Sequence, residues 1–280
     1  MAASYTLQTF MQSDLFYCFL HLDTFLFPVP CFLFPIPLFC TFARMGQKKL
    51  IRFEAIKGFD NVLEYPEGMQ GKWNEFFKND HAITVELACG KGEYAVGLGR
   101  MYPDRNFIGI DIKGNRIWRG AKTALDEGLD NVAFIRSHMD KITNYFQVGE
   151  VSEIWITFPD PQLRISRAKK RLTHPKFLRL YQQILSPGGL VHLKTDSPDL
   201  YQFTLLVIQL YGLTLLEQSD NIYAQPHIKP ELCIKTHYEG LDIAQSNRIH
   251  YLCFRLDKEL PLETDTILKS HLHEPATDRG

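Results

Sequence analysis

The sequence predicts an α/β protein whose mostly parallel, seven-stranded sheet carries helices on both faces. From residue 81 onward, short apolar runs alternate with segments of helical periodicity, a pattern typical of parallel strands joined by crossover helices. The expected strands span 82–87, 106–111, 132–136, 153–158 and 189–195, with two more at 214–217 and 248–256. The expected helices span 93–101, 115–127, 175–185 and 201–211. In such a sheet ligands bind beyond the carboxyl ends of the strands, so the residues that follow each strand are the candidates for chemistry.

The composition is that of an ordinary globular protein with one core. Of its 280 residues, 45% are apolar and 22% are charged. The formal net charge of −1 conceals one asymmetric region, because no Asp or Glu occurs between 161 and 195. The basic residues of that region are Arg164, Arg167, Lys169, Lys170, Arg171, Lys176, Arg179 and Lys194. The pattern indicates a local basic surface on a protein that is not basic as a whole.

Residues 1–44 differ from the rest of the chain. The stretch 15–42 is rich in Phe, Leu, Pro and Cys, and Asp23 is its one formally charged residue. Prolines interrupt any helix long enough to span a membrane, and the lack of Lys and Arg before Arg44 disfavours a secretory signal. We therefore expect the functional protein to begin at Met45. An interfacial or signal-like segment is the alternative interpretation.

The expected organisation is an atypical apolar extension at 1–44, a lead-in at 45–80, one domain at 81–258 and a tail at 259–280. No membrane association is expected of 45–280. Cys89, Cys233 and Cys253 lie far apart in the sequence and lack the spacing of a zinc site, so no metal is expected. Such a set is typical of the reducing cytoplasm, where we expect the protein to be a monomer or a homodimer.

The first predicted strand ends in a glycine-containing turn. The run Glu86-Leu87-Ala88-Cys89-Gly90-Lys91-Gly92 leads directly into a helix. Gly90 and Gly92 let the backbone turn tightly and approach a ligand. Asp111 ends the next strand, where nucleotide-binding folds place a carboxylate on ribose hydroxyls. Similar turns occur in other α/β proteins, so the turn alone does not identify the ligand.

Two cofactors are compatible with this turn. Gly90-x-Gly92-x-x-Ala95 satisfies a loose dinucleotide fingerprint, which would make the protein an NAD-dependent oxidoreductase. Glu86 favours S-adenosylmethionine instead, because a carboxylate would repel a pyrophosphate and attract the ammonium and sulfonium cations of the methyl donor. A structural role of Glu86, as a helix cap or an ion-pair partner, is the alternative.

A second turn of interest ends the strand at 153–158. There Pro159-Asp160-Pro161 breaks the strand, and its two prolines fix φ on either side of Asp160. The carboxylate is thereby held at the rim of the sheet, next to the strand of Glu86 and at the start of the acid-free basic stretch. This position favours a functional Asp160 over an ordinary surface carboxylate.

Taken in order, these segments resemble the bacterial tRNA (guanine-N7)-methyltransferase family. The matching motifs are Glu86-Leu87-x-x-Gly90-x-Gly92, Phe107-Ile108-Gly109-Ile110-Asp111, Phe158-Pro159-Asp160-Pro161, Lys169-Lys170-Arg171-Leu172, Pro187-Gly188-Gly189, His192-Leu193-Lys194-Thr195-Asp196 and Ile234-Lys235-Thr236-x-Tyr238-Glu239. The resemblance covers about residues 50–256 and leaves 1–44 without a counterpart. It implies a Rossmann-like class I S-adenosylmethionine-dependent methyltransferase fold. It also implies formation of N7-methylguanosine at position 46, in the variable loop of tRNA.

The resemblance further implies roles for individual residues. Those that would hold the methyl donor are Glu86, Gly90, Gly92, Asp111 and His138. Those that would contact the substrate, beside a catalytic Asp160, are Arg164, Asp196, Thr236 and Glu239. The sequence departs from the family pattern at two places. His138 stands where many members have an Asp or Asn that contacts adenine, and Gln162 and Arg164 stand where many have Trp and Lys.

The implied chemistry needs few groups. Guanine N7 carries a lone pair and no proton, so its methylation requires alignment rather than a general base. A carboxylate beside the base would stabilise the positive charge that develops on the purine, the role expected of Asp160. Asp196 or Glu239 would accept from the N1–H and amino groups of guanine. The candidates for phosphate contacts with tRNA are Arg167, Lys169, Lys170 and Arg171.

Three other functions remain compatible with the sequence. The protein could methylate another nucleic-acid acceptor such as an exocyclic amine, or it could be the NAD-dependent oxidoreductase considered above. It could also be a non-catalytic RNA-binding module that kept the fold. The combined presence of Glu86, Asp111 and Asp160 speaks against a loss of catalysis.

Overall fold

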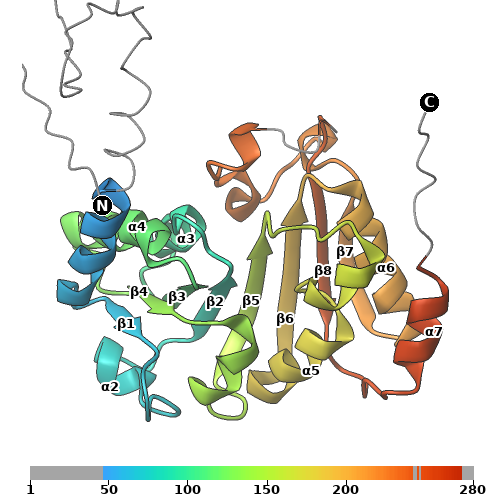
Figure 1. Cartoon of the computed structure of the whole chain (residues 1–280), viewed down its shortest axis with the longest axis horizontal. Coiled ribbons are helices and arrows are strands. Elements are labelled where there is room, and N and C mark those ends of the chain that lie inside the picture. Colours follow the sequence, from blue (N-terminus) through green and yellow to red (C-terminus); the bar gives the residue numbers. More distant parts are fainter. Residues whose placement is uncertain (1–46, 242–244, 246, 273–280) are drawn as a thin grey trace, which may run out of the picture. The chain divides into compact units, whose positions relative to one another are not determined.

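One mixed sheet organises the protein. The computed structural model describes residues 47–241, 245 and 247–272, and these form an eight-stranded sheet in the order β1-β4-β3-β2-β5-β6-β8-β7 (Figure 1). Its strands are β1 (Val62–Glu64), β2 (Ile83–Leu87), β3 (Asn106–Asp111), β4 (Val132–Arg136), β5 (Val151–Thr157), β6 (Leu185–Thr195), β7 (Thr214–Ser219) and β8 (His250–Arg255). Strands β1 to β6 are parallel, whereas β8 runs antiparallel to β6 and β7. The strand order reverses between β2 and β5, so their carboxyl ends border the expected ligand site.

Helices connect the strands. The α-helices between and after the strands are α2 (Trp73–Phe77), α3 (Glu93–Met101), α4 (Gly114–Asp126), α5 (Pro175–Ile184), α6 (Pro198–Leu210) and α7 (Thr264–Ser270). The 3₁₀ helices are η1 (Ile56–Gly58), η2 (Met139–Asn144), η3 (Ile165–Lys170), η4 (Ile222–Ala224), η5 (Pro230–Cys233) and η6 (Glu239–Leu241). Residues 50–55 are also helical and lead directly into η1.

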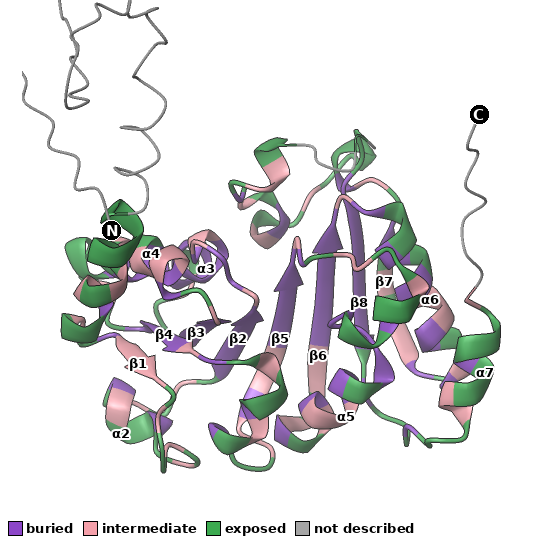
Figure 2. Ribbon diagram, viewed as in Figure 1, coloured by how far each residue is buried: buried purple, intermediate pink, exposed green. Residues whose placement is uncertain are grey.

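Both faces of the sheet are covered, as predicted. Alternate residues of a strand point to opposite faces, and on β3 and β4 this places Ile108 and Ile135 in one buried cluster but Phe107 and Phe134 in another. Helices α2, α5 and α6 contribute to the first cluster, and α3 and α4 to the second. The central strands are therefore buried along their length (Figure 2). Burial on both faces explains their near-continuous apolar sequences.

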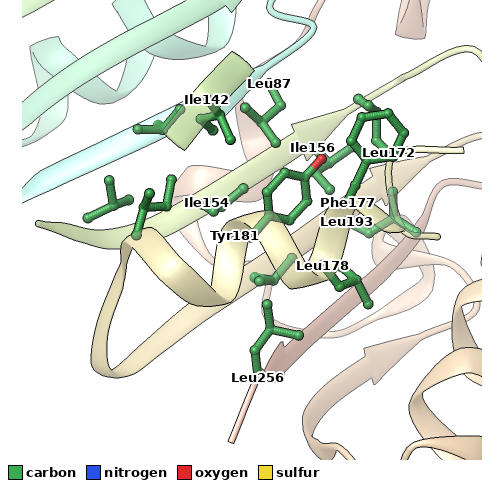
Figure 3. Packing of buried hydrophobic residues seen from close by; sticks show 14 of the residues in the cluster. Leu87, Ile142, Ile154, Ile156, Leu172, Phe177, Leu178, Tyr181, Leu193 and Leu256 are labelled. Atoms are coloured by element: carbon green, nitrogen blue, oxygen red, sulfur yellow. The ribbon is translucent and has the colours of Figure 1, made fainter. Parts of the chain in front are cut away.

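Helix α5 packs on the strand that carries the proline turn. Its Phe177, Leu178 and Tyr181 lie beside Ile154 and Ile156 of β5 in the first cluster (Figure 3). All five side chains are at most 8% exposed. This packing fixes β5, and with it the turn that follows β5 at the edge of the sheet.

The start of α5 is fixed by a side-chain cap. His174 Nδ1 accepts a hydrogen bond from the backbone N–H of Lys176 at 3.0 Å, and Pro175 occupies the first turn. Burial lowers the pKa of His174 to about 4, so the imidazole is neutral and able to accept. The basic stretch before α5 therefore ends at a rigid point.

The predicted helices and strands are present, with some shifted ends. Strand β6 begins at Leu185 instead of 189, and α6 begins at Pro198 because Ser197 caps it by accepting from Leu200 N at 3.3 Å. The predicted number of strands was wrong by one. The additional β1 has three half-buried residues that pair with β4, too few to show a periodic pattern.

Residues outside the predicted 81–258 domain contribute to the core. Trp73 of the lead-in is fully buried and donates from its indole nitrogen to Tyr145 O at 2.9 Å. In the expected tail, Leu268 of α7 is 1% exposed, and Asp265 forms an ion pair with Arg179. The extension 1–44 lies outside the described residues. Among the helices that are described, none is long and apolar enough to cross a membrane.

Candidate active site

The turn after β2 is built as the sequence predicted. Gly90 and Gly92 have φ values of +56° and +70°, the left-handed region that favours glycine. A Cβ atom on Gly92 would lie 2.4 Å from Cε1 of Phe134, so a side chain there would also clash. The N–H of Gly90 donates to Oδ2 of Asp111 at 3.0 Å. The structure therefore joins the turn to the carboxylate at the end of β3.

Asp111 is held in one orientation at the edge of the sheet. Its Oδ1 accepts from Lys113 N at 2.8 Å, while its Oδ2 accepts from Gly90. Each carboxylate oxygen has a second lone pair. The group can thus accept hydrogen bonds from a ligand while it stabilises the turn.

Glu86 lies beneath the turn and is enclosed by protein. Its side chain is buried, Oε2 accepts from Ala95 N at 2.9 Å in the first turn of α3, and Oε1 accepts from the Thr157 hydroxyl at 2.7 Å. Burial raises the pKa of Glu86 to about 8. This geometry is the helix-capping role that was the alternative interpretation. Glu86 also links the end of β2 to the end of β5.

The turn after β5 presents Asp160 to solvent. Phe158 and Gln162 both have positive φ, +47° and +48°, and the N–H of Phe158 donates to Lys194 O at 2.8 Å. Pro159 is buried, whereas Asp160 is exposed. Its Oδ1 accepts from Gln162 N at 3.0 Å. The carboxylate is therefore both accessible and fixed in direction.

Lys194 is a site residue that the sequence analysis did not single out. It lies on β6 with a fully buried side chain, and its ammonium donates to Leu232 O at 2.8 Å, Ile234 O at 2.9 Å and Glu239 Oε2 at 2.9 Å. Burial lowers the pKa of Lys194, and the Glu239 carboxylate opposes this shift. The sequence does show a lysine within an apolar strand. Because a lysine is rarely buried unless it is paired, this position could have indicated a buried partner for Lys194.

Glu239 and Thr236 form one hydrogen-bonded unit. Glu239 N donates to the Thr236 hydroxyl at 3.2 Å, and Glu239 Oε1 accepts from the Tyr223 hydroxyl. The Glu239 side chain is 5% exposed. Because the side chain is buried and its charge is balanced by Lys194, the arrangement favours a structural role over the expected contact with guanine. Asp196, which is half-buried where β6 ends, is the other acceptor that the sequence offered.

Residues 222–241, here called the covering segment, lie beyond the carboxyl ends of β5 and β6 and are orange in Figure 1. A Cβ on Gly90 would lie 3.1 Å from the ring of Tyr238. His237 N donates to Glu93 Oε2 at 3.0 Å, and the Tyr94 hydroxyl donates to Glu231 O. The covering segment is therefore attached both to the glycine turn and, through Lys194, to β6.

Comparisons with known proteins agree with this geometry. The family model described as "Putative methyltransferase" matches residues 80–252. The tRNA (guanine-N(7)-)-methyltransferase of Christiangramia forsetii is 48% identical over 223 residues, which is 76% of this chain and 100% of that protein. That of Bacteroides thetaiotaomicron is 44% identical over 77% of this chain and 88% of its own length. The chain belongs to the tRNA (guanine-N7)-methyltransferase family.

A solved structure supports the fold of this tRNA (guanine-N7)-methyltransferase family member. The crystal structure of the 16S rRNA methyltransferase KamB superposes with a TM-score of 0.51 and covers 69% of this chain and 97% of its own. At 13% sequence identity, this similarity concerns the fold alone. The predicted class I methyltransferase architecture is thereby confirmed.

Two of the residues that the family resemblance assigned to the site stand at its margins. His138 is exposed where β4 ends, and β4 is separated from β5 by β3 and β2. Arg164 is exposed just before η3, four residues after Asp160. Arg164 is therefore on the same connection as the exposed carboxylate, whereas His138 belongs to the half of the sheet that carries Asp111.

The basic stretch of this family member divides into exposed and internal residues. Arg171 is 6% exposed, its guanidinium lies 4.4 Å from the centre of the Phe203 ring, and it donates to Gln162 O at 3.3 Å. These contacts favour a structural role for Arg171 over the expected phosphate contact. Arg179 and Lys194 are likewise engaged internally. The exposed members are Arg164, Arg167, Lys169, Lys170 and Lys176.

The histidine of β6 is a packing residue in this structure. His192 stacks on Trp155 with ring centres 4.0 Å apart, and its Nδ1 shares a hydrogen bond with the Tyr251 hydroxyl at 2.9 Å. Burial lowers the pKa of His192 to about 3, so it stays neutral. Within the described part of the chain, no three His, Cys, Asp or Glu side chains are grouped to hold a metal ion.

Proposed function

We propose that this protein acts in the cytoplasm and transfers the methyl group of S-adenosylmethionine to guanine N7 in the variable loop of tRNA. Relatives named tRNA (guanine-N(7)-)-methyltransferase match it at 44–48% identity over most of the chain. The observation that carries the proposal is Asp160, an exposed carboxylate fixed at the carboxyl end of β5, beside the point where the strand order reverses. This is the position at which open α/β sheets bind their ligands.

The residues at the β2 turn suit the methyl donor. Gly90 and Gly92 adopt the positive φ that the tight turn requires, and Asp111 has lone pairs left for the hydroxyls of a ribose. Glu86 lies behind the turn, and a cation bound in front of it would favour its charged form. When bound, S-adenosylmethionine supplies a methyl group whose bond to sulfur breaks as the N7 lone pair forms the new bond, and sulfur keeps the electron pair.

Asp160 has an electrostatic task in this reaction. Guanine N7 has no proton to remove, so no general base is required, but the purine gains a positive charge. A carboxylate held next to the base stabilises that charge in the transition state. The hydrogen bond from Gln162 N to Oδ1 keeps the carboxylate in place before the substrate arrives. Asp196, half-buried where β6 ends, is the residue that we assign to the donors on the Watson–Crick edge of guanine.

The exposed basic residues after Asp160 suit an RNA substrate. Arg164, Arg167, Lys169 and Lys170 surround or form η3, and all are accessible. Such cations bind phosphates without reading sequence, so they would position tRNA while Asp160 and Asp196 contact the guanine.

The test is to incubate the protein with radiolabelled S-adenosylmethionine and unmodified tRNA and to identify the labelled nucleoside. We expect 7-methylguanosine, and none from a tRNA in which the variable-loop guanosine is replaced by adenosine. A label on an exocyclic amine would indicate a different methyl acceptor. Tight binding of NAD with no methyl transfer would overturn the proposal in favour of the oxidoreductase.

A further inference from the structure

A groove of about 540 Å³ runs between α3, α4 and the covering segment. Glycines bring its walls together: a Cβ on Gly97 would lie 2.9 Å from Ile234, and one on Gly120 would lie 2.7 Å from Lys91 O. Because neither glycine has a side chain, the covering segment packs closely on α3 and the β2 turn packs closely on α4 at the floor of the groove. The groove is distinct from the connection that carries Asp160.

The groove has an excess of positive charge. Lys91, Arg100, Arg119 and Lys235 line it, together with one acid, Glu93. Arg100 is paired with Glu127, with Nη2 and Oε1 2.6 Å apart. Counting these residues gives four positive and two negative charges.

Three of these cations are available to a ligand. No carboxylate among the described residues lies within ion-pairing distance of Lys91, Arg119 or Lys235. Arg119 and Lys235 are exposed, and Lys91 is half-buried. The one acid of the groove, Glu93, accepts a hydrogen bond from His237 N through Oε2 at 3.0 Å. The groove therefore attracts anions.

One end of the groove reaches the candidate active site. Lys91 lies between the two glycines of the β2 turn, and Lys235 precedes Thr236 in the covering segment. The groove then follows α3 as far as Met101. The nine residues of α3 extend about 13 Å. That length exceeds the ~3.4 Å per phosphate along the axis of one nucleic-acid strand, so an extended polyanion fits better than a single small anion.

We propose that this groove binds the phosphate backbone of the RNA substrate, as a second contact surface on the opposite side of the strand-order reversal from η3. The inference rests on the proposed function, since it assigns a further surface to the same substrate. The two basic surfaces follow β2 and β5, whose carboxyl ends are adjacent. An RNA held at both would span the strand ends that carry Asp111 and Asp160.

The test compares two variants of the full chain. Arg119→Ala combined with Lys235→Ala removes two cations of the groove. Lys122→Ala is the matched control, because Lys122 is exposed on the same helix but is paired with Asp126 at 2.8 Å. We expect the double variant to bind unmodified tRNA more weakly and to flatten the slope of log K against log salt by roughly 1.4–1.8, or 0.7–0.9 per lost contact. The control should retain the wild-type slope.

Binding of S-adenosylmethionine should be unchanged in both variants, which shows that the fold is intact. Arg119→Glu alone serves as a second variant that leaves the covering segment untouched, and it too should weaken tRNA binding. A wild-type affinity and slope in Arg119→Glu and in the double variant would overturn the inference. Failure of the proposed function would appear differently, as wild-type protein that binds tRNA but forms no 7-methylguanosine.

Discussion

Lys194 and Glu239 form a buried ion pair, with Nζ 2.9 Å from Oε2 and side chains that are 0% and 5% exposed. Lys194 belongs to β6, and Glu239 belongs to the covering segment, so the pair connects the sheet to the segment above its edge. The remaining two donors of the ammonium bind Leu232 O and Ile234 O. Each charge is removed from water and depends on the other for compensation.

Replacing Lys194 with Met should therefore destabilise the protein. The variant leaves the Glu239 carboxylate buried without its cation, a change that typically costs about 3–5 kcal/mol. It also frees the carbonyls of residues 232 and 234, so amide hydrogen exchange should accelerate across 230–241. The free energy of unfolding is measured by urea denaturation, and the local effect by hydrogen exchange with mass spectrometry.

Lys229→Ala is the control for this prediction. Lys229 also pairs with a carboxylate, that of Glu217, but their side chains are 54% and 41% exposed. A pair so accessible to water contributes at most about 1 kcal/mol. If Lys194→Met costs no more than Lys229→Ala, the buried pair does not anchor the covering segment.

The buried carboxyl of Glu86 should make stability depend on pH. Burial raises its pKa to about 8 in the folded protein, above the ordinary value of about 4.5 for a glutamate. Between these values the folded protein holds a proton that the unfolded chain has lost. This contribution to stability is complete below about pH 4.5 and is lost as pH rises through about 8, by at most about 1.4 kcal/mol per pH unit.

Glu86→Gln should abolish this dependence. The amide oxygen can still accept from Ala95 N, and the amide nitrogen can donate to the Thr157 hydroxyl, but the side chain no longer titrates. The variant should gain stability relative to wild type as pH rises from 5 to 8. Urea denaturation at several pH values measures this, with the exposed Glu67→Gln as control. If the free energies of unfolding of Glu86→Gln and wild type change with pH in the same way, the buried carboxyl ionises without a cost in stability.

Much of the site could be predicted because its parts are contiguous in the sequence. The glycine turn, Asp111 and the turn around Asp160 each follow a strand whose apolar run is recognisable. The topology of a parallel sheet then brings those strand ends to one edge. Local sequence and a general rule of folding were therefore sufficient for these elements.

The remaining contacts join residues that are far apart in the sequence, and no local sequence pattern indicates them. Lys194 finds its partners 38 to 45 residues later, in a segment without helical or strand periodicity. In the sequence, Arg171 is one of several cations in a basic stretch. Its burial against the Phe203 ring results from the packing of α6 in the folded protein. Charge can be counted from a sequence, whereas its burial is decided by tertiary structure.

Gly92 should be less tolerant of a side chain than other glycines with positive φ. Alanine at Gly92 would incur left-handed backbone strain of about 1–2 kcal/mol. Its Cβ would also lie 2.4 Å from Phe134, and such overpacking adds about 1–3 kcal/mol. Gly188→Ala is the matched control, because its φ is +81° but no atom lies within 4 Å of the Cβ. Thermal unfolding should separate the two variants, and equal losses would contradict the steric argument.

Arg171 and its neighbours should respond differently to alanine substitution. Arg171→Ala removes charge-assisted hydrogen bonds to the carbonyls of Gln162 and Leu163, so we expect a loss of about 2 kcal/mol in unfolding free energy. Lys169→Ala combined with Lys170→Ala removes exposed cations, so stability should stay within about 0.5 kcal/mol. The slope of tRNA affinity against salt should flatten by roughly 1.4–1.8 in the lysine variant. A lysine variant that loses stability and keeps the wild-type salt slope, together with a stable Arg171→Ala, would contradict the division of the basic stretch into exposed and internal residues.

Asp160→Asn tests the electrostatic role proposed for the exposed carboxylate. Asparagine keeps an Oδ1 that can accept from Gln162 N, and both flanking prolines remain, so the turn should be preserved. The negative charge that would stabilise a purine becoming cationic is lost. We expect single-turnover methyl transfer to slow by roughly 100-fold or more, as when one preorganised electrostatic group is removed from an active site, with tRNA affinity nearly unchanged. Asp104→Asn, an exposed carboxylate before the amino end of β3, controls for a general change of charge. Weaker tRNA binding with a normal transfer rate would instead identify Asp160 as a docking residue.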